Sequence, residues 1–378
     1  MRIAGLFAGI GGIELGLQEA GHEGRLLCEI DAGASKVLAE RFKDTEIVAD
    51  VRKLRSLPKE VDLLAGGFPC QDLSQAGGTA GISGRNSGLV TEIFRLIKRR
   101  RPAWLFLENV SFMLQLARGN AMDFVASSLE DLGYRWAYRV VDSRAFGVPQ
   151  RRKRVFIIAS LKEDPRSVLF ADEAGDPAEM DHAGLACGFY WTEGTRGLGW
   201  AVDSIPTLKG GSTVGIPSPP AIWCPDGRFI TPDIRDAERL QGFPVDWTLP
   251  AETVTRASMR WKMVGNAVTV PAAAWVGSRL AKPGKPVLAA SRPLKAGTPF
   301  PTAAWFDGKQ RHAIEISQWP LANRWPSLLS FLKFPGKPLS RKAAEGFLRR
   351  LTASSLDYPP RFAADLARHI ERHGDKAA

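Results

Sequence analysis

Residues 2–12 read Arg2-Ile3-Ala4-Gly5-Leu6-Phe7-Ala8-Gly9-Ile10-Gly11-Gly12, an apolar run that leads into a glycine-rich turn. The run from Arg2 to Phe7 predicts a buried strand, and the following residues 13–20 predict a helix. Glycines at such a junction let the backbone approach a ligand, and the helix N-terminus favours negative charge. The turn is not the full dinucleotide fingerprint, because Glu14 stands where the third glycine would be.

The same alternation of apolar runs and amphipathic stretches continues through the first 160 residues. We expect strands over residues 25–29, 61–65, 104–107 and 155–159, and helices over residues 34–42 and 89–99. This alternation predicts an α/β fold with a mostly parallel sheet and helices on both faces.

The pattern changes after Leu161 and divides the chain into three parts. Residues 1–161 form the expected first domain, completed by residues 258–282, where apolar periodicity returns. Residues 162–257 are rich in Gly, Pro, Thr and Trp and predict a smaller, loop-rich domain. Residues 283–378 form a basic, partly helical C-terminal extension of unknown role.

Charge is concentrated near the C-terminus. The chain has 51 Lys and Arg against 40 Asp and Glu, a net charge of +11. Residues 285–378 hold 16 basic and 7 acidic side chains, so their net charge is +9. An excess of this kind favours a polyanionic partner, although a small helical domain with a solvated basic face explains it equally well.

Cysteine usage and hydropathy exclude several classes of protein. The four cysteines have no CxxC or Cys/His spacing, so we expect neither a disulfide scaffold nor a metal site. No apolar run reaches membrane-spanning length, and the first residues resemble a strand more than a signal peptide. We therefore expect a cytoplasmic protein with no membrane partner, and a monomer.

Three residues near the expected strand ends are candidates for chemistry. Cys70, in Pro69-Cys70-Gln71, follows a buried run and a glycine pair, which would place its thiol at the mouth of a site. The alternative is a core cysteine. Glu29 follows Gly12 by 17 residues and could accept hydrogen bonds from ribose hydroxyls, and Asp50 could bind an adenine amine. The alternative for either acid is a solvated residue at a strand end.

Together with four further motifs, these features resemble the DNA (cytosine-5) methyltransferase family of bacterial and phage restriction-modification systems. The motifs occur in order as Glu108-Asn109-Val110, Gln150-Arg151-Arg152-Lys153-Arg154, the segment from Arg235 to Pro244, and Gly265-Asn266-Ala267-Val268. The resemblance covers residues 1 to about 280. It implies a Rossmann-like sheet of the S-adenosylmethionine-dependent methyltransferases, with residues 162–257 as the target-recognition domain.

The resemblance also implies the reaction: transfer of a methyl group to C5 of a flipped-out cytosine in duplex DNA. It implies that Cys70 attacks C6 and that Glu108 holds or protonates N3. It further implies that Arg152 and Arg154 bind the base carbonyl and a phosphate and stabilise the Cys70 thiolate.

For the cofactor, the resemblance implies S-adenosyl-L-methionine, with S-adenosyl-L-homocysteine as product. The implied cofactor contacts are Phe7, Gly9, Gly11, Glu29, Ile30, Asp50, Val51, Leu89, Asn266 and Val268. The implied DNA contacts are Gln71, Arg151, Thr207, Leu208, Arg239 and Gln241, with Arg196, Lys209, Ser212, Thr213 and Arg228 as further candidates.

Two other functions are compatible with parts of the sequence. One is a tRNA cytosine-5 methyltransferase on the same scaffold, which the substantial second domain disfavours. The other is a non-catalytic DNA-binding regulator, which the intact Cys70, Glu108, Arg152 and Arg154 disfavour. The leading hypothesis implies a bacterial, nucleoid-associated enzyme whose partners are double-stranded DNA and a cognate restriction endonuclease system. If the basic extension binds DNA, we expect deletion of residues 285–378 to flatten the salt dependence of binding.

Overall fold

A computed structural model of the chain describes residues 1–69, 88–210, 217–295 and 297–373. The chain divides into two compact units. Unit 1 comprises residues 1–146, 153–177 and 267–322, and unit 2 comprises residues 147–152, 178–266 and 323–378.

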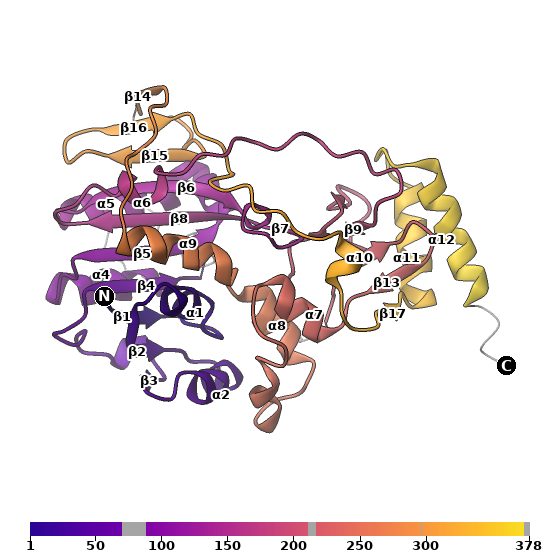
Figure 1. Cartoon of the computed structure of the whole chain (residues 1–378), viewed down its shortest axis with the longest axis horizontal. Coiled ribbons are helices and arrows are strands. Elements are labelled where there is room, and N and C mark those ends of the chain that lie inside the picture. Colours follow the sequence, from indigo (N-terminus) through magenta and orange to yellow (C-terminus); the bar gives the residue numbers. More distant parts are fainter. Residues whose placement is uncertain (70–87, 211–216, 296, 374–378) are drawn as a thin grey trace. The chain divides into compact units, whose positions relative to one another are not determined.

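Unit 1 contains a ten-stranded sheet with the order β14-β16-β15-β6-β8-β5-β4-β1-β2-β3 (Figure 1). Its strands are β1 (Arg2–Leu6), β2 (Glu23–Cys28), β3 (Glu46–Val48), β4 (Leu63–Gly67), β5 (Trp104–Val110), β6 (Arg135–Asp142), β8 (Lys153–Ser160), β14 (Ser291–Pro293), β15 (Ala303–Phe306) and β16 (Arg311–Ile314). The pairs from β3 to β5 are parallel, and those from β5 through β8, β6, β15 and β16 to β14 are antiparallel.

The expectation of a mostly parallel sheet is therefore corrected to a mixed sheet. The connection from β6 to β8, residues 143–152, contains no crossover α-helix, and a direct connection of this kind joins antiparallel strands. The C-terminal strands then extend the antiparallel half through β15.

Helices cover both faces of this sheet, as expected. They are α1 (Gly12–Glu19), α2 (Ala32–Arg41), α4 (Val90–Arg99), α5 (Asn120–Asp131), α6 (Arg166–Leu169) and α9 (Val270–Ala281). Ala4 and Leu6 of β1 share a core with α4 and α5, whereas Gly5 faces Glu14 of α1 on the opposite side. Helix α9 packs closely against α1, and the absence of a side chain at Gly16 permits this approach. A Cβ on Gly16 would lie 2.6 Å from the carbonyl oxygen of Val270.

Unit 2 contains a five-stranded antiparallel sheet with the order β10-β9-β12-β13-β17. These strands are β9 (Cys187–Phe189), β10 (Ala201–Val202), β12 (Ala221–Trp223), β13 (Phe229–Thr231) and β17 (Lys337–Pro338). A separate parallel pair joins β7 (Gln150–Arg151) to β11 (Ile205–Pro206). The helices are α7 (Ile234–Leu240), α8 (Met259–Asn266), α10 (Leu328–Phe331), α11 (Arg341–Thr352) and α12 (Pro360–Arg372).

The segment expected as a C-terminal extension is shared between the two units. Strands β14 to β16 complete the sheet of unit 1, and β17, α11 and α12 complete unit 2. In unit 2 the ring of Phe362 contacts Phe189, Phe229 and Phe347 in one aromatic core. Deleting residues 285–378 would thus remove core structure, so the deletion tests folding before it tests DNA binding.

We expect Phe362→Ala to lower the free energy of unfolding by about 3–5 kcal/mol, because it leaves a cavity among the rings of unit 2. Chemical denaturation followed by circular dichroism measures this change. Leu288→Ala is the control, since Leu288 is fully exposed and its truncation should change stability by less than about 0.5 kcal/mol. Equal effects of the two substitutions would contradict the assignment of α12 to this core.

Candidate active site

The glycine-rich turn between β1 and α1 has a left-handed backbone. Phe7, Gly9 and Gly11 have φ angles of 54°, 56° and 84°. A Cβ on Gly11 would lie 2.4 Å from the ring of Phe42, so a larger residue does not fit there. No atom lies within 4 Å of a Cβ built on Gly9, which leaves open space above this part of the turn.

Glu29 follows β2 and holds this turn in place. Its Oε2 accepts a hydrogen bond of 2.8 Å from the Gly9 N–H, and its Oε1 accepts one of 2.8 Å from the Asp31 N–H. Burial raises the pKa of the Glu29 carboxyl, and the two N–H groups oppose that rise. An ionised carboxylate has about four acceptor positions, so each oxygen can still accept a hydrogen bond from a ligand. The next residue, Ile30, is 66% exposed and offers apolar surface beside these oxygens.

The other expected cofactor residues are distributed over both units. Asp50 accepts hydrogen bonds from the backbone and guanidinium of Arg52, which lower the pKa of its carboxyl. Val51 and Val268 are buried in unit 1, and Leu89 immediately precedes α4 in the same unit. Asn266 is exposed at the end of α8 in unit 2.

Glu14 is a buried acid to which the sequence pattern gave no role. It lies in the first turn of α1, and both carboxyl oxygens are buried without a hydrogen-bond partner among the described residues. Burial, with a smaller contribution from the nearby charge of Glu29, raises the pKa of this carboxyl to about 8. Glu14 is therefore neutral at pH 7, so α1 does not place a second negative charge near Glu29.

Glu108 lies near the end of β5 between a glycine and an arginine of neighbouring strands. Its Oε1 lies 3.0 Å from Nε of Arg154 on β8, and both side chains are largely buried. A Cβ on Gly67 of β4 would lie 2.9 Å from the other carboxylate oxygen. Gly67 thus leaves room for this carboxylate, and Arg154 fixes its orientation.

The adjacent Asn109 fastens the segment that leads toward Cys70. Its Nδ2 donates a hydrogen bond of 3.0 Å to the carbonyl oxygen of Phe68, and its Oδ1 accepts one of 2.8 Å from the Val110 N–H. The Glu-Asn-Val motif therefore combines an ion-paired acid with a side chain that anchors the backbone at Phe68, two residues before Cys70. Cys70 and Gln71 themselves lie outside the described residues.

The remaining cysteines are unsuited to nucleophilic attack. Cys28, Cys187 and Cys224 are buried, and burial raises the pKa values of their thiols to about 11, 12 and 11. These three side chains are therefore thiols rather than thiolates at neutral pH.

In unit 2, Gln150 connects three segments that are distant in sequence. Its Nε2 donates to the carbonyl oxygen of Leu240 at 2.9 Å and to Oε1 of Gln241 at 3.0 Å, and its Oε1 accepts from the Leu208 N–H at 3.0 Å. Gln241 in turn donates to the carbonyl oxygen of Val264. Gln150 and Gln241 are both fully buried, so their amides organise the unit from within.

The basic and hydroxyl side chains expected at the DNA also make internal contacts. Arg152 is buried and donates to the carbonyl oxygen of Leu208 at 3.2 Å, and the Thr207 hydroxyl donates to the carbonyl oxygen of Arg151. Arg239 pairs with Asp236 and contacts the ring of Phe331. The buried Leu208 and Gln241 and the partly buried Arg239 thus have structural contacts that the motif alone did not reveal.

The further candidates of the second domain differ in their surroundings. Lys209 pairs with Glu193 and lies over the ring of Tyr190, and Arg228 pairs with Asp226. Ser212 and Thr213 lie outside the described residues.

No group of three or more His, Cys, Asp or Glu side chains in the described part of the chain is placed to hold a metal ion. No helix there is long and apolar enough to cross a membrane.

The α/β sheet, the glycine turn and the strand-end acids define a methyltransferase of the Rossmann-like class. The chain belongs to the family described as C-5 cytosine-specific DNA methylase, which it matches over residues 1–181 and 224–282. It is thus a DNA (cytosine-5) methyltransferase.

Individual relatives agree with this assignment. The chain is 46% identical to the Type II methyltransferase M2.BsuMI of Bacillus subtilis over the full length of both chains. It is 30% identical to the Type II methyltransferase M.Bsp6I of a Bacillus species, over 72% of this chain and 95% of the relative. The crystal structure of the S. pombe Dnmt2 methyltransferase shares the fold, with a TM-score of 0.53 at 16% identity over 75% of this chain and 98% of that one.

Glu14 predicts a pH-dependent difference in stability between wild type and Glu14→Gln. The folded-state pKa of about 8 exceeds the ordinary value of 4.5, so the folded chain retains a proton that the unfolded chain has lost between these pH values. The wild type therefore loses stability as pH rises from 4.5 to 8, and the glutamine variant does not lose this contribution. We expect the variant to gain about 3 kcal/mol relative to wild type between pH 5 and 7.5, measured by urea unfolding. Parallel pH curves would contradict a protonated Glu14.

Proposed function

We propose that this DNA (cytosine-5) methyltransferase uses S-adenosyl-L-methionine and attacks a flipped-out cytosine through Cys70. The observation that carries the proposal is the Glu108 carboxylate, held by Arg154 above Gly67 at the strand ends from which the Cys70 segment departs. The family match supplies the reaction class, and the geometry supports the roles that we propose for individual side chains.

The residues around the glycine turn fit S-adenosyl-L-methionine. The carboxylate of Glu29 retains acceptor positions for two ribose hydroxyls, Gly9 leaves open space, and Ile30 offers an exposed apolar surface to the adenine. Phe7 and Gly11 shape the turn. We assign the Asp50 carboxylate to accept a hydrogen bond from the adenine amine. We assign Val51, Leu89, Asn266 and Val268 to cofactor binding by the resemblance alone. When bound, this cofactor supplies a methyl group attached to a sulfonium ion.

Cytosine C5 is a poor nucleophile, and we propose that the side chains of this site increase its nucleophilicity. The thiolate of Cys70 forms a bond to C6, and the electron pair of the C5–C6 double bond becomes available at C5. Glu108 accepts a hydrogen bond from the exocyclic amine and, in its protonated form, donates one to N3, which limits negative charge on the ring. C5 then forms its bond to the methyl group as the bond between that group and the sulfonium sulfur breaks, which leaves S-adenosyl-L-homocysteine as product. Transfer of the C5 proton to a water molecule restores the double bond as the bond from the Cys70 sulfur to C6 breaks and releases the Cys70 thiolate.

Arginines stabilise the charges in this sequence. Arg154 orients the Glu108 carboxylate, and we assign it and Arg152 to the base carbonyl and a neighbouring phosphate. Because the target lies within a duplex, it must leave the base stack, at a cost of a few kcal/mol that contacts in the pocket offset. Among the expected DNA contacts, we retain Gln71, Arg151 and Thr207 as direct ones and assign Leu208, Arg239 and Gln241 to positioning.

The biological context follows from the relatives. The two curated relatives are Type II methyltransferases, and we propose that this chain also modifies a short recognition sequence, in a system with a restriction endonuclease. We further propose that it acts in the bacterial cytoplasm on duplex DNA.

The covalent mechanism predicts that Cys70→Ala abolishes methyl transfer. We expect a loss of at least 10³-fold in the transfer of radiolabelled methyl groups to plasmid DNA, because no other group supplies the bond to C6. Cys224→Ala is the matched control, since the buried Cys224 thiol should be dispensable for the chemistry.

A second readout separates chemistry from binding. With DNA in which 5-fluorocytosine replaces cytosine, fluorine blocks the final elimination, so wild type and Cys224→Ala should form a denaturant-resistant adduct. Cys70→Ala should form none. Methyl transfer by Cys70→Ala at the wild-type rate would refute the proposed nucleophile. A soluble wild type that binds DNA and transfers no methyl group would instead indicate a binding role.

A further inference from the structure

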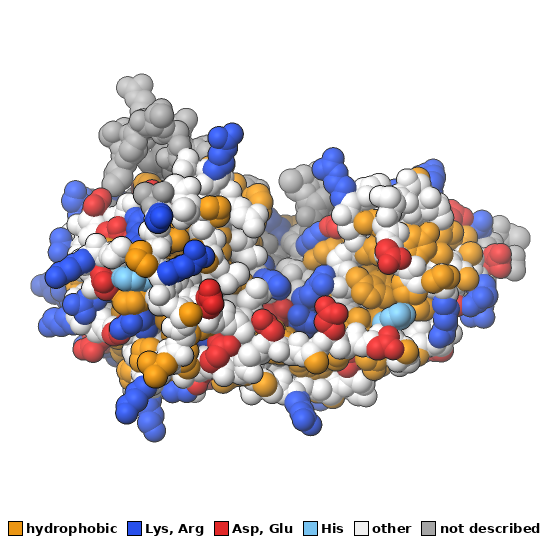
Figure 2. Space-filling model, turned by 90° about the horizontal axis from the view of Figure 1, so that it is seen from above, with side chains coloured by type: hydrophobic (Ala, Val, Ile, Leu, Met, Phe, Trp, Pro, Cys, Tyr) orange, Lys and Arg blue, Asp and Glu red, His pale blue; other side chains and the backbone are white. Residues whose placement is uncertain are grey.

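Net charge alone does not locate a DNA-binding surface on this protein. On the face shown in Figure 2, Lys and Arg side chains are interspersed with Asp and Glu. Many arginines of unit 2 also have carboxylate partners, among them Arg228, Arg235, Arg239, Arg260 and Arg368. A binding surface must therefore be sought where cations lack such partners.

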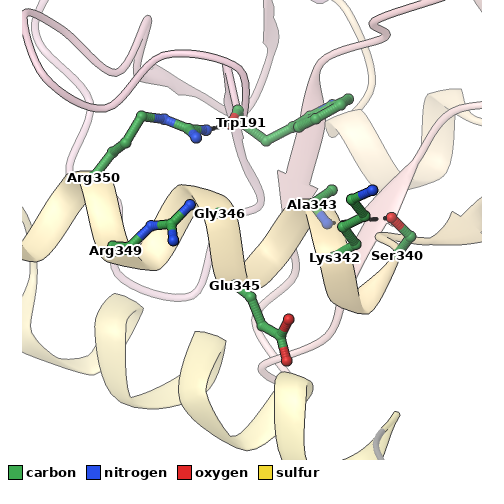
Figure 3. A pocket seen from close by; sticks show the side chains of 8 residues that line it. All are labelled: Trp191, Ser340, Lys342, Ala343, Glu345, Gly346, Arg349 and Arg350. Carbon is green, nitrogen blue, oxygen red and sulfur yellow. Dashed lines mark hydrogen bonds between the residues drawn. The ribbon is translucent and has the colours of Figure 1, made fainter.

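Helix α11 borders a groove of about 660 Å³ on unit 2 where this condition is met. We call it the α11 groove. Its walls include Trp191, Lys342, Gly346, Arg349 and Arg350 (Figure 3). Glu345 also borders it, but its carboxylate points away from Trp191 and pairs with Arg341 at 2.7 Å.

Three cations of the α11 groove have no carboxylate neutralising them within the described residues. Lys342 and Arg349 are exposed, and neither forms an ion pair there. Arg350 donates hydrogen bonds of 2.8 Å to the carbonyl oxygens of Trp191 and Glu193, which fix its guanidinium without cancelling its charge. Gly346 lies between these cations in the middle of α11, at a helical position where glycine is unfavourable, and leaves the groove open.

The α11 groove is connected to the residues that border the proposed DNA contacts. Trp191 and Glu193, which bind Arg350, continue from Tyr190, whose hydroxyl donates a hydrogen bond of 2.8 Å to the carbonyl oxygen of Thr207. Residues 190–193 thus form one short segment that binds Arg350 of the groove at one end. At the other end it binds Thr207, which directly follows β11. This continuity favours one ligand that extends along unit 2.

The spacing of the cations favours an extended polyanion over a single phosphate. Lys342 and Arg349 are seven residues apart, or about 10 Å along the helix axis. Duplex DNA presents one phosphate per strand for each 3.4 Å of its axis, so two such cations reach different phosphates. We propose that the α11 groove binds the phosphate backbone of substrate DNA outside the recognition sequence. The proposal rests on the DNA methyltransferase function proposed above.

The test is the salt dependence of binding to a fluorescein-labelled 40-base-pair duplex of random sequence, measured by anisotropy from 50 to 200 mM KCl. For the double variant Lys342→Gln/Arg349→Gln, we expect the slope of log K against log salt to decrease by about 2. Affinity at 0.1 M salt should fall by about tenfold or more. The control Lys337→Gln/Arg372→Gln removes the same charge from exposed positions of unit 2 outside the groove and should change both quantities much less.

Gly346 offers a matched pair of substitutions at one position. A Cβ there would meet only the far end of Arg350, at 3.4 Å, so Gly346→Ala should raise the melting temperature and retain binding. Gly346→Glu places a carboxylate among the cations and should weaken binding as the double variant does. If the groove variants and the control bind with equal slopes while the wild type methylates DNA, the groove proposal alone is overturned. If the wild type neither binds the duplex nor methylates DNA, the result contradicts the proposed function, and the groove proposal that rests on it falls as well.

Discussion

The interaction on which the proposed chemistry most depends is the ion pair between Glu108 and Arg154. Strand β8 runs antiparallel to β5, and this register sets Arg154 opposite Val110, close enough to hold the Glu108 carboxylate from one side. Gly67 leaves space on the other side, where any Cβ would collide with that carboxylate. The mixed sheet is thus the feature that positions a charged group at the strand ends, where a base can meet it.

Near the glycine turn, two acidic side chains differ in charge because their surroundings differ. Glu29 accepts two backbone hydrogen bonds, whereas Glu14 is buried without partners and has a pKa near 8. One acid can therefore serve a ligand while its neighbour stays neutral. In unit 2, by contrast, Gln150 and Gln241 satisfy each other and three backbone groups, so the region of the proposed DNA contacts rests on neutral buried amides.

The sequence predicted β1, β2, β4, β5 and β8 and the helices α1, α2 and α4, because their apolar periodicity is strong, but it named neither β3 and β6 nor α5. It did not predict that β8 runs antiparallel to β5, since periodicity does not encode strand direction. It also missed β14 to β16, which are strands of only three or four residues. It named Glu108 and Arg154 through motifs but not their pairing, which depends on register. Glu14 could have been found as an acid inside an apolar helix face. The internal roles of Arg239 and Gln241 required the tertiary structure.

We propose that Glu108 and Arg154 act as one unit in catalysis. A double-mutant cycle of Glu108→Gln and Arg154→Met, scored by the rate of methyl transfer from radiolabelled S-adenosyl-L-methionine to plasmid DNA, tests it most directly. We predict that each single variant loses at least about 10²-fold and that the double variant loses little more than either one. Losses that multiply in the double variant, or a single variant with the wild-type rate, would contradict the account.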